Sequence, residues 1–523
     1  MSKRPNFLFI ITDQHRADHL GCYGNKIVKT DNIDALAATG TRYERFYVAN
    51  PICMPNRASI MTGRMSSLHG ARHNGIPLSQ DHTTFVELLK DAGYGTGLIG
   101  KSHLQSFTGL EATNKFKPEA GKHTPTNGLR DAIKNNRHGT EYDLEIVPKW
   151  KTPLANRVDG NFYGFDHVQV AADHGDSATG DYLLWARSKH ENFDQLVGPE
   201  NAFPDNRINA PQAWRTAVPE ELYSTSWIAG CAEEYLEEQA NSEQPFFLQM
   251  SFPDPHHPFT PPGKYWDMYD PADIELPTSF GNGHLPPIQA MKEALRQGAD
   301  KRDNQNPFAV TEQEARELIA LTYGSITMVD DAIGRVLTRM KTLGLDENTV
   351  VIFTSDHGDY MGDHGLMLKL LLHFQSIIRV PFIWNDPTQR NGPKVAPGLG
   401  SSIDISSTIL ARAGVQPYNG IQGRDLMNSN APNAVVVEED SQRSMIGFDR
   451  PQRVRTLVTD RYRMSLRHGE DWGELYDLKQ DPHEMANLFD DPASLSVKNE
   501  LTALMLNKLI EFQDRAPLPA YRA

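Results

Sequence analysis

Four short apolar segments, each followed at once by charged or polar residues, constrain the fold of this chain more than any other feature. They are NFLFIIT at residues 6–12, GYGTGLIG at 93–100, PFFLQMSF at 245–252 and NTVVIFTS at 348–355. Turn residues bound each segment and helical patterns lie between them, an alternation that is typical of a parallel sheet. We therefore predict an α/β fold with a mostly parallel central sheet sandwiched by helices.

The intervening helices and a change of texture near the C-terminus complete the predicted organisation. Helical patterns cover residues 84–92, 224–239, 311–343 and 403–413, and the third begins with a Thr-Glu-Gln-Glu capping sequence. We expect that long helix to break near Gly324 or Gly334. After residue 432 the chain changes to short strands and a terminal helix at 496–516. We predict a main domain at 1–430 and a smaller α+β subdomain with an antiparallel sheet at 431–523.

Two long stretches, residues 107–217 and 265–306, lack a clear pattern. Both are rich in proline, glycine, asparagine and charged residues. We interpret them as excursions over the edge of the sheet where ligands bind, because loops at such an edge commonly shape substrate choice.

The polar residues that follow the four apolar segments are the first candidates for a functional site. Ligands of open α/β sheets bind outside the carboxyl ends of the strands. Residues at those ends should therefore lie along one edge of one sheet. The residues concerned are Asp13, Lys101, His103, His256, Asp356 and His357.

The segment NPICMPNRASIMTGR, residues 50–64, predicts a short helix with a cysteine at its start. Pro55 suits the first turn of a helix, and Gly63 suits the residue just past its end. Cys53 would then lie at the helix N-terminus, where unpaired N–H groups and the helix dipole favour an anion. Arg57, one turn further on, can point back to the same place.

The strand-terminal carboxylates indicate a metal site. Asp13 is followed by Gln14 and Asp356 by His357, so two carboxylates, an amide oxygen and an imidazole are available as ligands for a divalent cation. The nitrogen ligand makes Mn²⁺ as suitable as Ca²⁺. The alternative is that each aspartate caps the following helix. Two such pairs on one edge favour the metal.

Cations and histidines supply the remaining candidate groups. Lysine is usually a solvated surface residue, but Lys101 and Lys369 lie in apolar surroundings and would need an anionic partner. His103 and His256 are acid–base candidates, although a histidine after a strand is more often structural and His257 competes with His256. Weaker candidates are Gln14, His15, Asn74, His82, Asp363, His364 and His373.

Charge and cysteine content restrict the partners and the compartment. A formal net charge of −15 over 523 residues disfavours nucleic acid and anionic membranes, so an anionic substrate requires a local positive cluster. Three scattered cysteines make no disulfide framework. The first apolar run is too short for a signal-peptide core, and no segment is long enough to span a bilayer. We expect a cytoplasmic protein that binds neither nucleic acid nor membrane.

Taken together, these motifs resemble the type I sulfatases of the alkaline phosphatase superfamily. CMPNR followed by ASIMTGR is similar to their Cys-x-Pro-x-Arg signature. The motif gains specificity from LFIITDQHRADHLGCYG, GLIGKSH, SFPDPHHPF, VIFTSDHGDYMGDHGLMLK, IIRVPFI and WGELYDLKQDPHEMANL, all in family order. The resemblance covers about residues 5–110, 225–260, 310–425 and 455–490, and leaves out both unpatterned stretches.

The resemblance implies an alkaline phosphatase-like fold and hydrolysis of a small anionic sulfate ester. A formylglycine-generating enzyme would oxidise Cys53 to formylglycine, whose aldehyde is hydrated. One hydroxyl of the resulting diol, bound to the metal, would attack the sulfur of the ester. The alcohol then leaves, and the second hydroxyl expels sulfate and restores the aldehyde.

The resemblance also implies a role for each candidate residue. Arg57 would hold formylglycine and Asp13 in place, and His103 would assist the final breakdown. Lys101 and Lys369 would bind sulfate oxygens, and His256 would lie beside the leaving oxygen. The substrate-binding set is Asn74, Lys101, His256 and Lys369, and the metal ligands are Asp13, Gln14, residue 53, Asp356 and His357.

Departures from the common pattern define a branch and leave three hypotheses open. Many sulfatases have Asp in place of Gln14 and Asn in place of His357, and the Gln–His pair resembles the choline-sulfatase and phosphonate monoester hydrolase branch. Many members also have Ser or Ala where this chain has Asn56. The Lys101–His103 pair favours an arylsulfatase-type enzyme. The alternatives are a phosphonate monoester or phosphodiester hydrolase with cross-promiscuity, and an inactive binding protein with unmodified Cys53. Members of this branch are often dimers or tetramers, so we expect a homo-oligomer.

Overall fold

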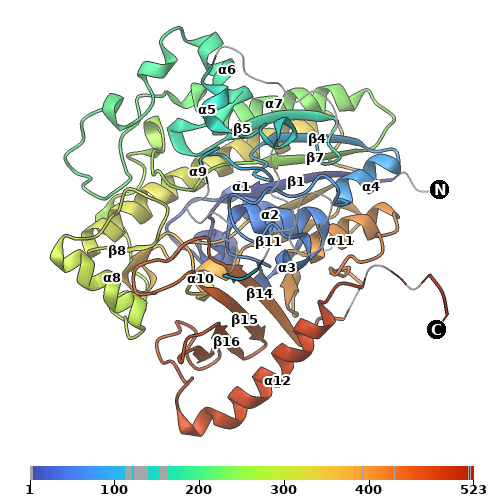
Figure 1. The fold of residues 1–523 in the computed structure, drawn as a ribbon. Coiled ribbons are helices and arrows are strands. Elements are labelled where there is room, and N and C mark those ends of the chain that lie inside the picture. The colour runs from blue at the N-terminus through green and yellow to red at the C-terminus, as the bar shows by residue number, and fades with distance from the viewer. Residues whose placement is uncertain are drawn as a thin grey trace.

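The computed structural model describes residues 4–111, 120–122, 139–152, 162–389, 394–428, 430–515, 518 and 520–522. A large sheet with helices on both faces forms most of the molecule, and a smaller sheet with the C-terminal helix lies beside it (Figure 1). Among the described residues, no helix combines the length and the apolar character needed to cross a bilayer.

The large sheet has nine strands in the order β12-β2-β11-β9-β1-β7-β4-β5-β6. The strands β9, β1, β7, β4 and β5 run parallel, whereas β11 is antiparallel to β9 and β6 is antiparallel to β5. This confirms the mostly parallel sheet. The bounds are β1 Asn6–Thr12, β2 Thr41–Tyr43, β4 Gly95–Gly100, β5 His167–Ala172, β6 Thr179–Gly180, β7 Phe246–Ser251, β9 Thr349–Ser355, β11 Phe382–Asn385 and β12 Lys394–Ala396.

Alternate residues of β1 enter two different cores, which shows that both faces of the sheet are covered. Phe7 and Phe9 join the core formed with α2 Cys53–Thr62, α4 Phe85–Asp91 and α11 Asp404–Ala413. Leu8 and Ile10 join the opposite core, formed with α1 Asp31–Thr39, α6 Asp181–Lys189, α7 Ser224–Ala240 and α9 Glu312–Thr342. A strand buried on both sides reads as a continuous apolar run, which explains why these central strands were visible in the sequence.

The C-terminal sheet is antiparallel, as predicted. Its strands are β14 Ala434–Asp440, β15 Arg453–Thr459, β16 Tyr462–Arg467 and β17 Glu474–Asp477, in that order. One face packs against α12 Leu495–Glu511, and Val435 and Val437 on β14 also join the core of the large sheet. The helix ends at Glu511 and not at residue 516, which lies outside the described residues. The domain boundary near residue 430 stays a prediction.

The long helix α9 is unbroken, contrary to our expectation. Both glycines serve close packing instead of a break. A Cβ atom on Gly324 would lie 2.2 Å from the carbonyl oxygen of Tyr265, and one on Gly334 would lie 2.5 Å from the side chain of Asn32. The predicted cap is present, because Thr311 and Glu314 form a reciprocal capping box.

The two unpatterned stretches contain more regular structure than we expected. Residues 107–217 contribute α5 Val147–Trp150 and α6, and they extend the central sheet by β5 and β6, while residues 265–306 contain α8 Pro286–Gln297. The strand β5 has a mixed sequence, HVQVAA, because it lies near the sheet edge and its first residues are only half-buried. The remaining short elements are β3 Phe46–Tyr47, α3 Ser66–His69, β8 Phe308–Ala309, β10 Leu366–Met367, α10 Gln375–Ile378 and β13 Gly400–Ser401.

Gly100, the last residue of β4, provides a test of how the sheet positions the adjacent Lys101. Its φ is +101°, and a Cβ atom there would lie 1.9 Å from the carbonyl oxygen of Ser251 on β7. We predict that Gly100→Ala lowers the free energy of unfolding by at least about 2 kcal/mol and reduces activity, because β4 and β7 must separate. Urea unfolding and a turnover assay would measure both effects.

The matched control is Gly95→Ala in the same strand, where the nearest atom to a new Cβ lies at 3.8 Å. We expect this substitution to change stability by no more than about 0.5 kcal/mol. Equal losses in the two variants would contradict the explanation.

Candidate active site

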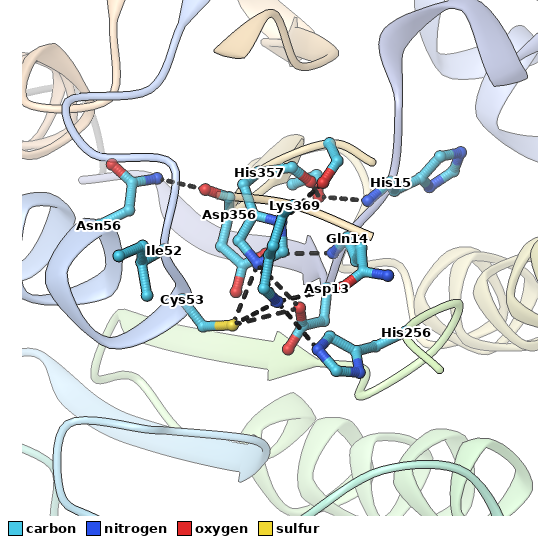
Figure 2. A network of polar contacts seen from close by, with 12 residues as sticks. Asp13, Gln14, His15, Ile52, Cys53, Asn56, His256, Asp356, His357 and Lys369 are labelled. Carbon is cyan, nitrogen blue, oxygen red and sulfur yellow. Dashed lines mark hydrogen bonds and ion pairs between the residues drawn. The ribbon is translucent and has the colours of Figure 1, made fainter. Parts of the chain in front are cut away.

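Strand register brings the predicted site residues together at the carboxyl edge of the sheet. Thr12 pairs with Ser355, so Asp13 and Asp356 are the next residues on two adjacent parallel strands. Gly100 pairs with Ser251, which places Lys101 and the segment carrying His256 beside each other. The side chains of Cys53, Asp13, Asp356, His357, Lys369 and His256 point toward one another (Figure 2).

Cys53 is the first residue of α2, as the sequence predicted. Gly63 ends the helix with φ +62°. The thiol lies 3.0 Å from His357 Nε2 and 3.1 Å from Lys369 Nζ. Burial and the Asp13 carboxylate raise the pKa of this thiol, but Lys369, His357 and Lys101 outweigh them and lower it to about 7. The sulfur therefore occupies a buried position that favours negative charge.

Four groups form a cluster whose composition suits a divalent cation. The ligand atoms of Asp13, Cys53, Asp356 and His357 all lie within 4.8 Å of one another, and all four residues are buried. Gln14 directly follows Asp13 and has a backbone φ of +62°. Its Oε1 accepts a hydrogen bond from Lys369 Nζ at 3.0 Å. Oxygen and imidazole donors of this kind match the ligand preferences of Mn²⁺ and Ca²⁺.

The orientation of His357 supports the same interpretation. Its Nδ1 lies 2.8 Å from the carbonyl oxygen of Gly358, so Nδ1–H donates there and Nε2 faces the carboxylates of Asp13 and Asp356. Burial and Lys369 lower the pKa of His357, but the neighbouring anionic groups outweigh them and raise it to about 10. The electrostatic field at Nε2 thus favours positive charge.

Arg57 connects three of the strand ends. Its Nε donates to Asp356 Oδ2 at 2.7 Å, and its Nη1 donates to the Lys101 carbonyl and to Ser251 Oγ, both at 2.9 Å. Asp13 lies further away, 3.9 Å from Nη2. Arg57 therefore orients chiefly Asp356, whereas the resemblance assigned it to residue 53 and Asp13.

The two lysines contact different members of the cluster. Lys101 Nζ pairs with Asp13, and its charge, together with the side chains of His174 and His357 beside the same carboxylate, outweighs the effect of burial and lowers the pKa of Asp13 well below its ordinary value. Lys369 Nζ lies 2.9 Å from both His256 Nε2 and His357 Nε2. Both side chains are buried, and together with Arg57 they give the site three cations beside two carboxylates.

A stack of three imidazoles forms one wall of the site. The ring of His256 stacks on His174 at 3.6 Å and on His257 at 4.0 Å between centroids. The Nδ1 of His256 donates to the carbonyl oxygen of His257 at 2.6 Å, so its Nε2 lone pair faces Lys369. Burial and the neighbouring histidines lower the pKa of His256 well below its ordinary value, which keeps the ring neutral.

His103 and Asn74 lie at the periphery of the cluster. His103 stacks on Phe107 at 3.9 Å, and Phe107 in turn faces the Lys101 ammonium. The Nδ1 of His103 is buried without a hydrogen-bond partner among the described residues. Asn74 Oδ1 accepts a hydrogen bond from the backbone N–H of Met54 at 3.3 Å, so it contacts the first turn of α2.

Three residues of the site were missed from the sequence. His174 Nε2 lies 2.6 Å from Lys101 Nζ, Asp359 Oδ2 accepts a hydrogen bond from Gln14 Nε2 at 2.5 Å, and Glu145 accepts two backbone hydrogen bonds beside His103. His174 follows β5 just as the other site residues follow their strands. The same strand-end rule would have identified it, had β5 been recognised.

Several weaker candidates have other surroundings. Asn56 is buried away from the thiol, where its amide joins Asp356 O, Ala49 N and Ser402 Oγ. His373 bonds Glu439 and Thr456 at the contact with the C-terminal sheet. His15 forms a hydrogen bond with Thr12, and the backbone N–H of His82 donates to the carbonyl oxygen of Ser79. Asp363 and His364 line a separate cavity.

Comparison with known proteins agrees with the geometry. The Sulfatase family model matches residues 5–415. The chain belongs to the sulfatase family. A second model, N-sulphoglucosamine sulphohydrolase C-terminal, matches residues 362–511. The recognition from sequence motifs is thereby confirmed.

Several relatives and solved structures are similar to this sulfatase over nearly its whole length. It is 29% identical to the uncharacterized sulfatase YidJ of Escherichia coli, with 99% of this chain and 90% of the relative covered. It is 28% identical to an arylsulfatase of Clostridium perfringens, with 93% and 90% covered. Its fold resembles that of the phosphonate monoester hydrolase of Agrobacterium radiobacter, with a TM-score of 0.74, 23% identity, and 98% and 97% covered.

The buried carboxyl group of Glu145 should make the free energy of unfolding depend on pH. Burial raises the pKa of its carboxyl group to about 7, although the backbone N–H groups of His103 and Gln105 oppose the shift. Because the folded state holds this proton more tightly, the free energy of unfolding should fall by about 3 kcal/mol between pH 4.5 and 7 and stay level above. Glu145→Gln cannot ionise, so its unfolding profile should lack this component.

Urea unfolding at a series of pH values, with Glu141→Gln as control, measures the difference. Glu141 is a neighbouring exposed carboxylate. The unfolding free energy of Glu141→Gln should change with pH as that of the wild-type sulfatase does. Parallel profiles for all three proteins would show that Glu145 does not carry the shift.

Proposed function

We propose that this sulfatase hydrolyses sulfate monoesters of the arylsulfatase type, and that Cys53 is the precursor of formylglycine. The observation that supports this best is the position of Cys53. Its thiol lies at the start of α2 between two carboxylates, His357 and Lys369, and all of these groups are buried. The arrangement does not require Cys53 to act as a thiol nucleophile with a neighbouring general base. Each neighbouring group has a role toward a metal ion or an oxyanion instead.

One divalent cation, Mn²⁺ or Ca²⁺, fits the cluster of Asp13, Gln14, Asp356 and His357 together with residue 53. It would supply charge stabilisation and lower the pKa of a hydroxyl on residue 53. The fit rests on the donor atoms of Asp13, Cys53, Asp356 and His357, which lie within 4.8 Å of one another, and on the direction of His357 Nε2, which faces the two carboxylates. Arg57 holds Asp356 in place through the hydrogen bond from its Nε.

The chain's own residues supply the remaining functions. Lys369 Nζ lies 3.1 Å from the Cys53 thiol and Lys101 Nζ pairs with Asp13. Both lysines would bind the non-bridging oxygens, where negative charge accumulates in the transition state. His256 Nε2 and Lys369 Nζ are 2.9 Å apart, so this pair can pass a proton to the leaving oxygen. Stacking on His174 and His257 fixes the plane of the His256 ring.

Cys53→Ala tests the nucleophile. We predict a loss of activity of at least about 10³-fold with the fold and the bound metal retained, because the four other ligands remain. Turnover, thermal unfolding and metal analysis measure the three properties. Cys231→Ala, which removes a buried thiol on α7 away from the site, is the matched control and should keep its activity.

Intact mass of the tryptic peptide that contains residue 53, from protein purified from its native host, completes this test. Formylglycine in place of cysteine is the expected result. An unmodified thiol in every molecule, or unfolding of Cys53→Ala, would contradict the proposal.

A phosphonate monoester hydrolase would use similar groups, because both transition states place charge on non-bridging oxygens near a metal. We predict that kcat/KM for an aryl sulfate exceeds that for an aryl phosphonate monoester of the same leaving group. Steady-state kinetics with both esters on one metal-loaded preparation make the comparison. A phosphonate preference of several orders of magnitude would assign the site to the second reaction.

A further inference from the structure

His174 lies between two residues that serve different parts of the proposed reaction, Lys101 and His256. It follows β5 and is 3% exposed. Its Nε2 lies 2.6 Å from Lys101 Nζ, and its ring stacks on that of His256 with centroids 3.6 Å apart and planes inclined by 13°. His174 thus joins the lysine that would bind the sulfate group to the histidine that would lie beside the leaving oxygen.

The contact with Lys101 fixes the direction of the imidazole ring. A lysine ammonium group can only donate hydrogen bonds, so His174 Nε2 must accept one and the ring proton lies on Nδ1. Nδ1 faces Asp173, whose Oδ1 is 3.3 Å away and accepts a hydrogen bond from it. Asp173, His174 and Lys101 therefore form a chain of polar contacts that ends at the Asp13 carboxylate.

This chain gives the Lys101 ammonium a defined orientation. Among the described residues, its hydrogen-bond partners are Asp13 and His174, and the ring of Phe107 lies 5.3 Å away. An ammonium group carries three N–H donors. Because two of them are held in fixed directions, the third also points in one direction and is available to an oxygen of the ester. A lysine that contacted Asp13 alone could rotate its other two donors.

The backbone around His174 is shaped to hold the ring in this place. Asp173 has φ +71°, which is uncommon for a residue other than glycine. Gly175 has φ +57°, and a Cβ atom there would lie 2.9 Å from both Pro258 Cγ and Thr260 Oγ1. The turn at 173–175 therefore packs directly on the segment that follows His256. Uncommon backbone conformations of this kind cluster at functional sites.

We propose that His174 is a positioning residue that couples Lys101 to His256. It holds the ammonium group by accepting its hydrogen bond, and it holds the plane of His256 by stacking. Binding of the sulfate oxygens and proton transfer to the leaving oxygen are thereby kept in one geometry. The inference rests on the proposed function, the hydrolysis of an ester at residue 53. A histidine that only filled space would not need to direct Nε2 at a buried ammonium group.

Two variants separate the two contacts of His174. His174→Phe keeps a ring for the stack but removes the acceptor, whereas His174→Gln keeps an acceptor near the position of Nε2 but removes the ring. We measure kcat/KM with 4-nitrophenyl sulfate and with phenyl sulfate, whose leaving phenolates differ in basicity. His174→Phe should lose about 10-fold with both esters, the equivalent of one hydrogen bond to a charged group. His174→Gln should lose at least about 10-fold more with phenyl sulfate, because a poorer leaving group depends more on the proton from His256.

A purely structural role of His174 predicts a different result. It would lower the thermal unfolding temperature of both variants and leave the ratio of the two kcat/KM values at that of the wild type. That outcome, or unchanged kcat/KM in His174→Phe, would overturn the proposal. His167→Gln, at the start of β5 and outside the cluster, is the matched control and should keep both kcat/KM values.

Asp173→Gly provides a test that does not replace a buried ring. The Asp173 side chain is 37% exposed, and glycine keeps the positive φ, so the variant should fold. Because it removes only the acceptor for Nδ1–H, we expect kcat/KM to fall about 5-fold with both esters. Wild-type kcat/KM in this variant would overturn the role of Asp173 in holding the ring.

Titration with inorganic sulfate needs no turnover and so separates this inference from the proposed function. His174→Phe should bind sulfate about 10-fold more weakly than the wild type, and His174→Gln should bind it with wild-type affinity. Equal sulfate affinity in His174→Phe and the wild type would overturn the positioning of Lys101. Failure of the wild type to hydrolyse either aryl sulfate would instead contradict the proposed function, and aryl phosphonate monoesters with the same two leaving groups would then serve to compare the variants.

Discussion

The structure depends on the burial of Asp13 and Asp356 side by side at the end of two parallel strands. Two buried carboxylates repel each other and lose hydration, so the fold must supply compensating charge. Arg57 pairs with Asp356 and Lys101 with Asp13, and Lys369 adds a third buried cation beside Cys53 and His357. The helix α2, the end of β4 and the loop after β9 are held together by this requirement, and the same requirement makes the place suitable for a metal ion and an anionic ester.

Backbone geometry, as much as side-chain chemistry, permits the arrangement. Gly100 lets β4 approach β7 so closely that no other residue fits, and Gln14 adopts a positive φ to turn its amide toward Lys369. Asp359 then links Gln14 to the backbone of Met361 and Leu368, which fixes the loop that carries Lys369.

Much of the fold and of the site could be predicted because the central strands are buried on both faces. Such strands are continuous apolar runs, and the polar residue that follows each run is visible at once. The strand β5, next to the edge strand β6, lacks this signal, since its sequence mixes polar and apolar residues, and His174 was missed with it. The expected break in α9 was wrong because a glycine in a helix can serve packing, and only the neighbouring Tyr265 and Asn32 reveal that use.

The sequence by itself determined the class of fold, the family, and the residue types gathered at the strand ends, because local apolar runs and short motifs carry that information. Tertiary structure alone decided which partner each group takes. Arg57 pairs with Asp356 more closely than with Asp13, His256 lies in a stack of three imidazoles, and Glu145 supports the turn at His103. These pairings join residues far apart in the chain, and the register of the strands and the packing of loops fix them.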